Sequence, residues 1–154
     1  MKELTFRKAH YEDLDQYFKW ANDPNVRKNA VDSESIPYEN HCEWFQKKLS
    51  DSNCYMYLFF YQGKPCGQIR FEIHEGVAEI DFSVDKSYRG KGLGIQILTE
   101  GTEQFKKEAG SKILIKGIVK KINTASLKAF HKSGFSEVSQ FEKKGVLYSN
   151  FIKE

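Results

Sequence analysis

The segment Arg89-Gly90-Lys91-Gly92-Leu93-Gly94 follows a strand-like run, Glu79-Ile80-Asp81-Phe82-Ser83-Val84, and precedes a helical pattern. In that pattern apolar residues recur three or four positions apart from Leu93 to Phe105, and Gly110 follows its end. A loop between a strand and a helix directs several backbone N–H groups at one point, and the helix start adds partial positive charge. Because glycines also let a bulky anion approach the backbone, the segment predicts a phosphate or pyrophosphate site.

Two common phosphate-binding motifs do not fit this loop. A Walker loop requires Ser or Thr after Gly-Lys, and here Gly92 follows Gly90-Lys91. A dinucleotide fingerprint that starts at Gly90 requires glycine where Ile95 stands, and one that starts at Gly92 requires it at Ile97. Taken alone, the glycines are equally compatible with a simple helix cap at a corner of the chain.

The rest of the chain alternates between strand and helix patterns. Before the loop we expect, in order, a strand at Leu4–Arg7, a helix at Tyr11–Trp20 stopped by Pro24, a short segment at Val26–Asn29, a helix from Pro37 to about Leu49, and strands at Cys54–Tyr61, Cys66–Ile73 and Val77–Val84. After it we expect a strand at Ile113–Val119, a helix at Asn123–Lys132, and strands at Phe135–Phe141 and Val146–Phe151. The prediction is a single domain, residues 1–154, of α/β (α+β) class. Its mixed, mostly antiparallel sheet has six to seven strands and is flanked by about four helices.

Composition excludes several other classes of protein. The chain has 154 residues, of which 40% are apolar and 29% charged, as in an ordinary globular domain. The net charge is only +3 and no long basic run occurs, so nucleic acid is not an expected partner. No apolar run suits a membrane span or a signal peptide, which predicts a cytoplasmic protein. Three cysteines without a C-x-x-C pair and four scattered histidines predict neither a disulfide framework nor a metal site.

Two motifs resemble the GNAT superfamily of acetyl-CoA-dependent N-acetyltransferases. They are Arg89-x-x-Gly92-x-Gly94 after the strand, and Asn123-x-x-Ser126-x-x-x-Phe130-x-x-x-Gly134-Phe135. The expected order of elements also matches that fold over the whole chain. The resemblance implies acetyl-CoA as cosubstrate and no metal. It implies contacts to the coenzyme from Phe82, Ser83, Val84, Arg89, Gly90, Lys91, Gly92, Leu93, Gly94, Asn123, Ser126 and Phe130.

The N-terminal third resembles a narrower branch of that superfamily. Three segments carry the likeness: Trp20–Arg27, His41-x-x-Trp44-Phe45 and Gly67–Phe71. The branch acetylates amino groups on nucleotide-linked sugars, as in pseudaminic-acid pathways. The resemblance implies an acceptor pocket formed by Arg27, His41, Trp44 and Arg70. Three alternatives stay open: acetylation of a protein N-terminus, acetylation of a small amine, and a coenzyme A-binding module without catalysis. The final strands are compatible with a homodimer.

Acetyl transfer to an amine needs a group that accepts the proton of the amine. Glu79 and Asp81 alternate on one strand, so both side chains lie on the same face just before the loop. We favour Glu79, because Ala78-Glu79-Ile80 resembles the acidic position of the branch, and we expect Asp81 to be solvated or ion-paired.

Transfer also needs donors for the tetrahedral oxyanion and a proton for the departing thiolate. Backbone N–H groups near Ser83 or Val84 would serve the oxyanion. Many GNAT enzymes place a tyrosine four residues before the Gly-Phe pair, to protonate the thiolate, and this chain has Phe130 there. Ser126 or water would then supply the proton, or the thiolate would leave without one, since thiols are far more acidic than alcohols.

Overall fold

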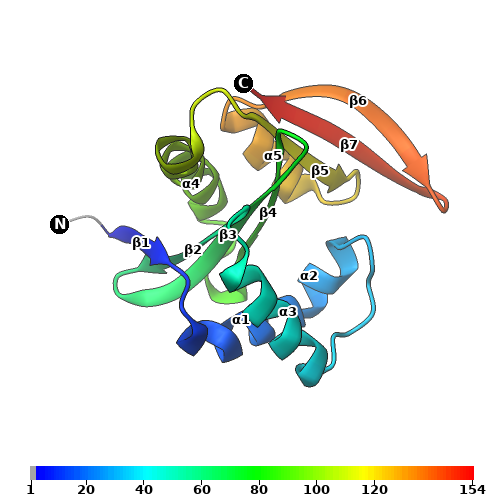
Figure 1. The fold of residues 1–154 in the computed structure, drawn as a ribbon. Helices are drawn as coiled ribbons and strands as arrows, with labels where there is room; N and C mark the ends of the chain where they lie inside the picture. Colours follow the sequence, from blue (N-terminus) through cyan, green and yellow to red (C-terminus); the bar gives the residue numbers. More distant parts are fainter. Residues whose placement is uncertain (1–2) are drawn as a thin grey trace.

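The computed structural model describes residues 3–154, which form one seven-stranded sheet with helices on both faces (Figure 1). The strands are β1 (Leu4–Lys8), β2 (Cys54–Tyr61), β3 (Lys64–His74), β4 (Val77–Val84), β5 (Leu114–Lys120), β6 (Ser136–Lys143) and β7 (Val146–Lys153). The helices are α1 (Leu14–Ala21), α2 (Pro24–Asn29), α3 (Tyr38–Ser50), α4 (Leu93–Ala109) and α5 (Thr124–Lys132), with short 3-10 helices η1 (Tyr11–Asp13) and η2 (Lys86–Tyr88). The strand order is β1-β2-β3-β4-β5-β7-β6, and β4–β5 is its parallel pair. The predicted fold class and mostly antiparallel sheet are confirmed.

The first helix begins later than predicted. Residues Tyr11–Asp13 form a 3-10 turn, and α1 starts at Leu14. The carboxylate of Asp13 explains this, because it accepts hydrogen bonds from the guanidinium of Arg7 at 2.8 and 2.9 Å and from the N–H of His10 at 2.7 Å. Tyr11, which the pattern assigns to the buried face, is 55% exposed.

The segment after α1 is a true helix, so the fold has five α-helices where about four were predicted. Pro24 ends α1 and is also the first residue of α2, a position where its missing N–H costs nothing. The side chain of Asp23 caps α2 by accepting from the N–H groups of Asn25 and Val26.

Both faces of the central sheet are buried, which explains why β2 reads as a nearly unbroken apolar run. On one face Tyr57 and Phe59 of β2 belong to a core with Ile97, Leu98 and Phe105 of α4. On the other face Met56 and Leu58 belong to a second core with Leu14, Tyr17 and Trp20 of α1 and Phe45 of α3. Figure 1 shows α4 and α5 on one side of the sheet and α1, α2 and α3 on the other.

The sheet opens between β4 and β5. Their parallel pairing joins Val77–Ile80 to Leu114–Gly117. Beyond it, within residues 3–154, Asp81–Val84 pair only with β3 and Ile118–Lys120 only with β7. Since one edge of β4 is left without a strand, backbone donors and acceptors become available to a ligand at this position.

Candidate active site

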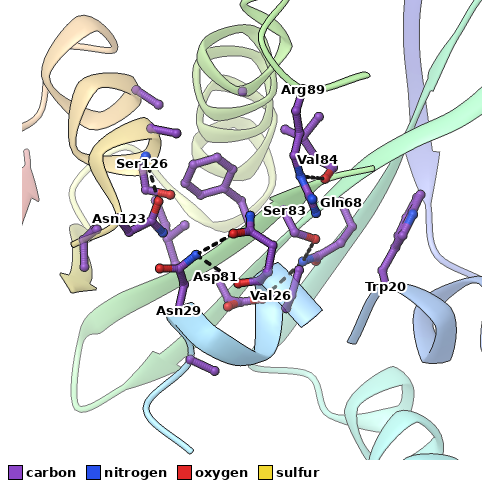
Figure 2. A pocket seen from close by; sticks show the side chains of 18 of the residues that line it. Trp20, Val26, Asn29, Gln68, Asp81, Ser83, Val84, Arg89, Asn123 and Ser126 are labelled. Atoms are coloured by element: carbon purple, nitrogen blue, oxygen red, sulfur yellow. Dashed lines mark hydrogen bonds between the residues drawn. The ribbon is translucent and has the colours of Figure 1, made fainter. Parts of the chain in front are cut away.

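A cavity of about 870 Å³ lies where β4 and β5 separate. Its walls come from α1, α2 and α3 on one side and from α4 and α5 on the other, with β3, β4 and β5 between them. Figure 2 shows Asn123 and Ser126 on one side of the cavity, Trp20 on the opposite side, and Gln68, Asp81 and Ser83 between them. One cavity thus joins the loop of the motif to the N-terminal helices.

The start of α4 has the geometry that an anion site requires. The helix begins at Leu93, and its N-cap Gly92 has φ 78°, a left-handed conformation that glycine adopts without strain. Gly90 has φ 80°. No side chain of the described residues caps this helix. Gly92, Leu93, Gly94 and Ile95 all line the cavity, and the first N–H groups of a helix have no partner within the helix, so they can serve a ligand there.

The two basic side chains of the loop are engaged elsewhere. Arg89 donates from Nε to the carbonyl of Val84 at 3.0 Å and from Nη2 to Asp23 Oδ1 at 3.2 Å (Figure 2 shows the bond to Val84). Its guanidinium therefore ties the end of β4 to the cap of α2. Lys91 is outside the cavity lining and lies over the ring of Tyr88, 5.6 Å from its centre. The groups of this loop that remain available to bind an anion are therefore mainly its backbone N–H groups.

The second motif lies on α5, on the same side of the cavity as α4. Asn123 caps this helix, with Oδ1 accepting from the N–H of Ser126 at 3.2 Å, and both residues line the cavity. Phe130 also reaches the lining but is 2% exposed and packs edge-on against Phe82. A Cβ at Gly117 would lie 2.5 Å from the ring of Phe130, so that glycine makes room for it.

An ion-paired network crosses the other half of the cavity floor. Arg70 Nε donates to Glu72 at 2.7 Å, and its guanidinium lies 3.5 Å from Asp81 and stacks 4.9 Å from the ring centre of Trp44. Lys48 of α3 extends this ion-paired network, because it also pairs with Glu72. Burial alone would lower the pKa of Arg70, but Asp81 and Glu72 outweigh it and raise that pKa. Arg70 therefore stays charged, and the carboxylates of Glu72 and Asp81 balance its positive charge.

The two candidate carboxylates are in different surroundings. Asp81 lines the cavity, where Gln68 and Arg70 contact it. Both carboxylates are exposed, but Glu79 is outside the lining, beside Glu72 of β3 and Lys116 of β5 in the strand register. Both lie on the same face of β4, as predicted, but Glu79 is still in the paired part of the strand, before the sheet opens. Any direct role for Glu79 remains a prediction, and its position does not favour it.

The cavity is lined by all four residues of the acceptor pocket that the resemblance implies: Arg27, His41, Trp44 and Arg70. Two of them, His41 and Arg27, also hold parts of the protein together. His41 is 1% exposed and donates from Nε2 to the carbonyl of Leu14 at 3.1 Å, and burial lowers its pKa. Arg27 donates to the carbonyls of Asp32 and Glu34, which fixes the loop after α2.

Several lining residues escaped the sequence analysis. Gln68 lies two positions before Arg70 on β3, so the strand period alone places both on one face. Tyr17 was assigned only to the first helix, and Trp20 only to the end of that helix and to the segment Trp20–Arg27 that carries the resemblance. In the structure Trp20 donates from Nε1 to Asp85 at 2.8 Å. Asp23 and Lys120 lie outside the lining and act through partners that are distant in sequence: Asp23 accepts from Arg89 at 3.2 Å, and Lys120 donates to the carbonyl of Lys28 at 2.8 Å.

None of the described helices combines the length and apolar character of a membrane span. No group of three or more His, Cys, Asp or Glu side chains within residues 3–154 is arranged to hold a metal ion.

Comparisons with known proteins agree with this geometry. The family model of the acetyltransferase (GNAT) domain matches residues 3–136. In Bacillus subtilis (strain 168), "Putative phosphinothricin acetyltransferase YwnH" is 29% identical over 145 residues, which cover 90% of this chain and 87% of that protein.

Two solved structures share the fold at 17% identity. One is AAC(6')-Ib in complex with ribostamycin and coenzyme A, with a TM-score of 0.83 over 99% of this chain and 93% of that one. The other is RimL, a ribosomal L7/L12 alpha-N-protein acetyltransferase in complex with coenzyme A, with a TM-score of 0.84 over 99% and 94%.

The family model spans most of the chain, including the strand, the glycine loop and α5. The fold of the whole described chain is also that of solved acetyltransferases. The chain therefore belongs to the GNAT acetyltransferase domain family and is an acyltransferase.

Proposed function

We propose that the protein transfers the acetyl group of acetyl-CoA directly to a primary amine, most simply the amino group of a nucleotide-linked amino sugar. One observation carries the proposal. The uncapped start of α4 and the unpaired edge of β4 open into the same cavity, directly beside Asp81. Backbone N–H groups from Gly92 to Ile95 would hold the pyrophosphate, and Lys128 and Lys132, which also line the cavity, would meet further phosphate charge.

The chemistry follows from where the groups lie. The thioester would lie along Asp81–Val84, whose free backbone N–H groups can stabilise the oxyanion. The amine nitrogen attacks the carbonyl carbon, the N–C bond forms, and the C–S bond breaks. Asp81 takes the amine proton, and the thiolate leaves and takes a proton from Ser126 or solvent. The proposal therefore assigns the base to Asp81 in place of Glu79.

The charges of the residues that line the cavity limit the class of amine that can serve as acceptor. Among the described residues that line the cavity, Asp81 is the single acid, against five basic side chains: Arg27, Arg70, Arg89, Lys128 and Lys132. Arg70 and Arg89 are paired with carboxylates, so Arg27, Lys128 and Lys132 supply the excess positive charge. A polycationic acceptor, such as a polyamine or an aminoglycoside, would need several acids there. Trp44 and Trp20 offer flat apolar faces to a sugar or base. A monoamine with an anionic group fits this lining best.

A second acceptor is favoured by the relative in Bacillus subtilis. YwnH bears the name of an enzyme for phosphinothricin, and it is 29% identical to 90% of this chain. Phosphinothricin is a small primary amine with two acidic groups, so it meets the same charge requirement.

The test measures the release of free thiol from acetyl-CoA with four acceptors: UDP-glucosamine, L-phosphinothricin, an alanyl tetrapeptide and ribostamycin. We expect turnover with one of the first two and at most slow turnover with ribostamycin. Turnover with the tetrapeptide alone would reject the small-molecule proposal. Coenzyme A binding without thiol release from any amine would reject the transferase proposal for these acceptor classes.

A further inference from the structure

The segment between α1 and α3 forms part of the cavity wall without belonging to either core. No residue from 21 to 36 is buried or packs in a core cluster, yet Val26 and Arg27 of α2 line the cavity. Two hydrogen bonds between Asn22 and Ile36, at 2.7 and 2.8 Å, close the base of the segment. A six-residue helix is too short to be stable in isolation, so other contacts must hold α2 in place.

Two cations hold the ends of α2, and they come from opposite sides of the gap between β4 and β5. At the N-terminal end, Arg89 Nη2 donates to Asp23 Oδ1 at 3.2 Å, and the same oxygen caps α2. At the C-terminal end, Lys120 Nζ donates to the carbonyl of Lys28 at 2.8 Å. Lys120 is the last residue of β5, whereas Arg89 follows β4. The short helix is therefore fixed to both strands that border the gap.

The position of Arg89 depends on the two segments that the coenzyme would contact. Its Nε donates to the carbonyl of Val84 at 3.0 Å. Under the proposed function, the thioester arm lies along Asp81–Val84 and the pyrophosphate lies at Gly92–Ile95, so the coenzyme fixes the chain on either side of Arg89. The guanidinium then fixes Asp23, whose side chain is only 12% exposed. When a first ligand orders a group, a second ligand that uses the group loses less entropy on binding.

We propose that the Arg89–Asp23 pair couples the two halves of the cavity: coenzyme A at the α4 loop fixes α2, and α2 then binds the acceptor amine more tightly. The inference rests on the proposed function and makes Arg89 and Asp23 positioning residues. By linkage, the amine raises the affinity for coenzyme A by the same factor. Lys120 has a different part, since it joins α2 to β5, away from the coenzyme loop, and holds the helix equally with and without coenzyme.

The test is calorimetry of the most active amine of the panel with free enzyme and with enzyme saturated with coenzyme A. In the wild type, coenzyme A should tighten amine binding about fivefold or more, a typical coupling. In Asp23→Ser this gain should fall to about twofold or less, because Ser still caps α2 but is too short to reach Arg89. Asp32→Ser is the matched control and should keep the gain. Asp32 is exposed in the same segment, and its side chain accepts from the N–H of Glu34 at 3.1 Å without a cation among the described residues.

Lys120→Met separates coupling from a merely structural role. It should weaken amine binding equally with and without coenzyme A, so that the gain stays at the wild-type value. Asp23→Asn keeps the cap and a neutral hydrogen bond to Arg89, so it should show an intermediate gain, and it covers the case in which Asp23→Ser does not fold.

Three results overturn the inference: no gain in the wild type, a full gain in the folded Asp23 variants, or an equal loss of the gain in Asp32→Ser or Lys120→Met. Wild-type enzyme that releases no thiol with any amine instead rejects the proposed function, which separates the two failures.

Discussion

Under the proposed function, the two halves of the cavity would recognise their ligands by different means. At the α4 loop the binding groups would be backbone N–H groups, because the side chains of Arg89 and Lys91 are turned to other partners. In the acceptor half the candidate groups are side chains, Asp81, Gln68 and Arg70, which hydrogen bonds and ion pairs hold in place. A backbone site tolerates changes of side chain and depends on conformation, whereas a side-chain site depends on the identity of each residue.

The largest expected effect tests the acceptor half. Asp81→Asn removes the proton acceptor but nearly preserves shape, so kcat should fall about 100-fold or more, as is usual for loss of a general base. The affinity for coenzyme A should not change, because the loop is intact. Steady-state kinetics and calorimetry measure the two quantities.

Glu79→Gln is the matched control for that prediction. Glu79 is on the same strand and the same face but outside the cavity, so its turnover should stay within about twofold of wild type. The assignment of the base to Asp81 is wrong if Glu79→Gln loses turnover and Asp81→Asn keeps it.

The next effect tests the backbone half. Gly92 has φ 78°, which a β-branched residue rarely adopts, so Gly92→Val should distort the first turn of α4 and weaken coenzyme A binding about tenfold or more. Calorimetry with coenzyme A measures the change. Gly63→Val supplies the control, since Gly63 has φ 80° in the β2–β3 turn, far along the chain from this loop. Equal weakening by both variants would show a general loss of stability instead of a binding effect.

The smallest expected effect concerns the ion pairs of Glu72 with Lys48 and Arg70, beneath the acceptor half of the cavity. Burial tends to raise the pKa of Glu72, but hydrogen bonds and charges from Lys48 and Arg70 outweigh it, so that pKa is lowered in the folded protein. The ionised group therefore stabilises the fold above its unfolded pKa, near 4.3, and this stability is lost as pH falls through the folded value.

Glu72→Gln should accordingly reduce the free energy of unfolding by about 2 kcal/mol at pH 7. The difference between variant and wild type should shrink as pH falls below the unfolded pKa of Glu72, because the unfolded carboxylate then takes up a proton before the folded one does. Urea unfolding at pH 7 and pH 3.5 measures it. A difference that is equal at both pH values would show that charge is not its cause.

The contrast between the halves also explains what could be predicted from the sequence. The fold and the α4 loop follow from local patterns: apolar periodicity, the glycines at 90, 92 and 94, and Asn123 as a helix cap. The start of α4 and the cap of α5 lie where those patterns place them.

The acceptor half could not be predicted in the same way. Its contacts join residues distant in sequence, such as Trp44 with Arg70 and Gln68 with Asp81. The choice between Glu79 and Asp81 depends on where β4 separates from β5, and the strand itself carries no mark of that point. Period-two alternation would have put Gln68 on the same face as Arg70, although only Arg70 was predicted, which shows that a strand face should be considered as a whole.

A crystal structure with coenzyme A bound would test the division between the two halves most directly. The account predicts pyrophosphate oxygens within hydrogen-bond distance of the N–H groups of Gly92–Ile95, and the thiol beside β4 between Asp81 and Val84. A pyrophosphate held by side chains away from the start of α4, or a thiol distant from Asp81, would contradict it.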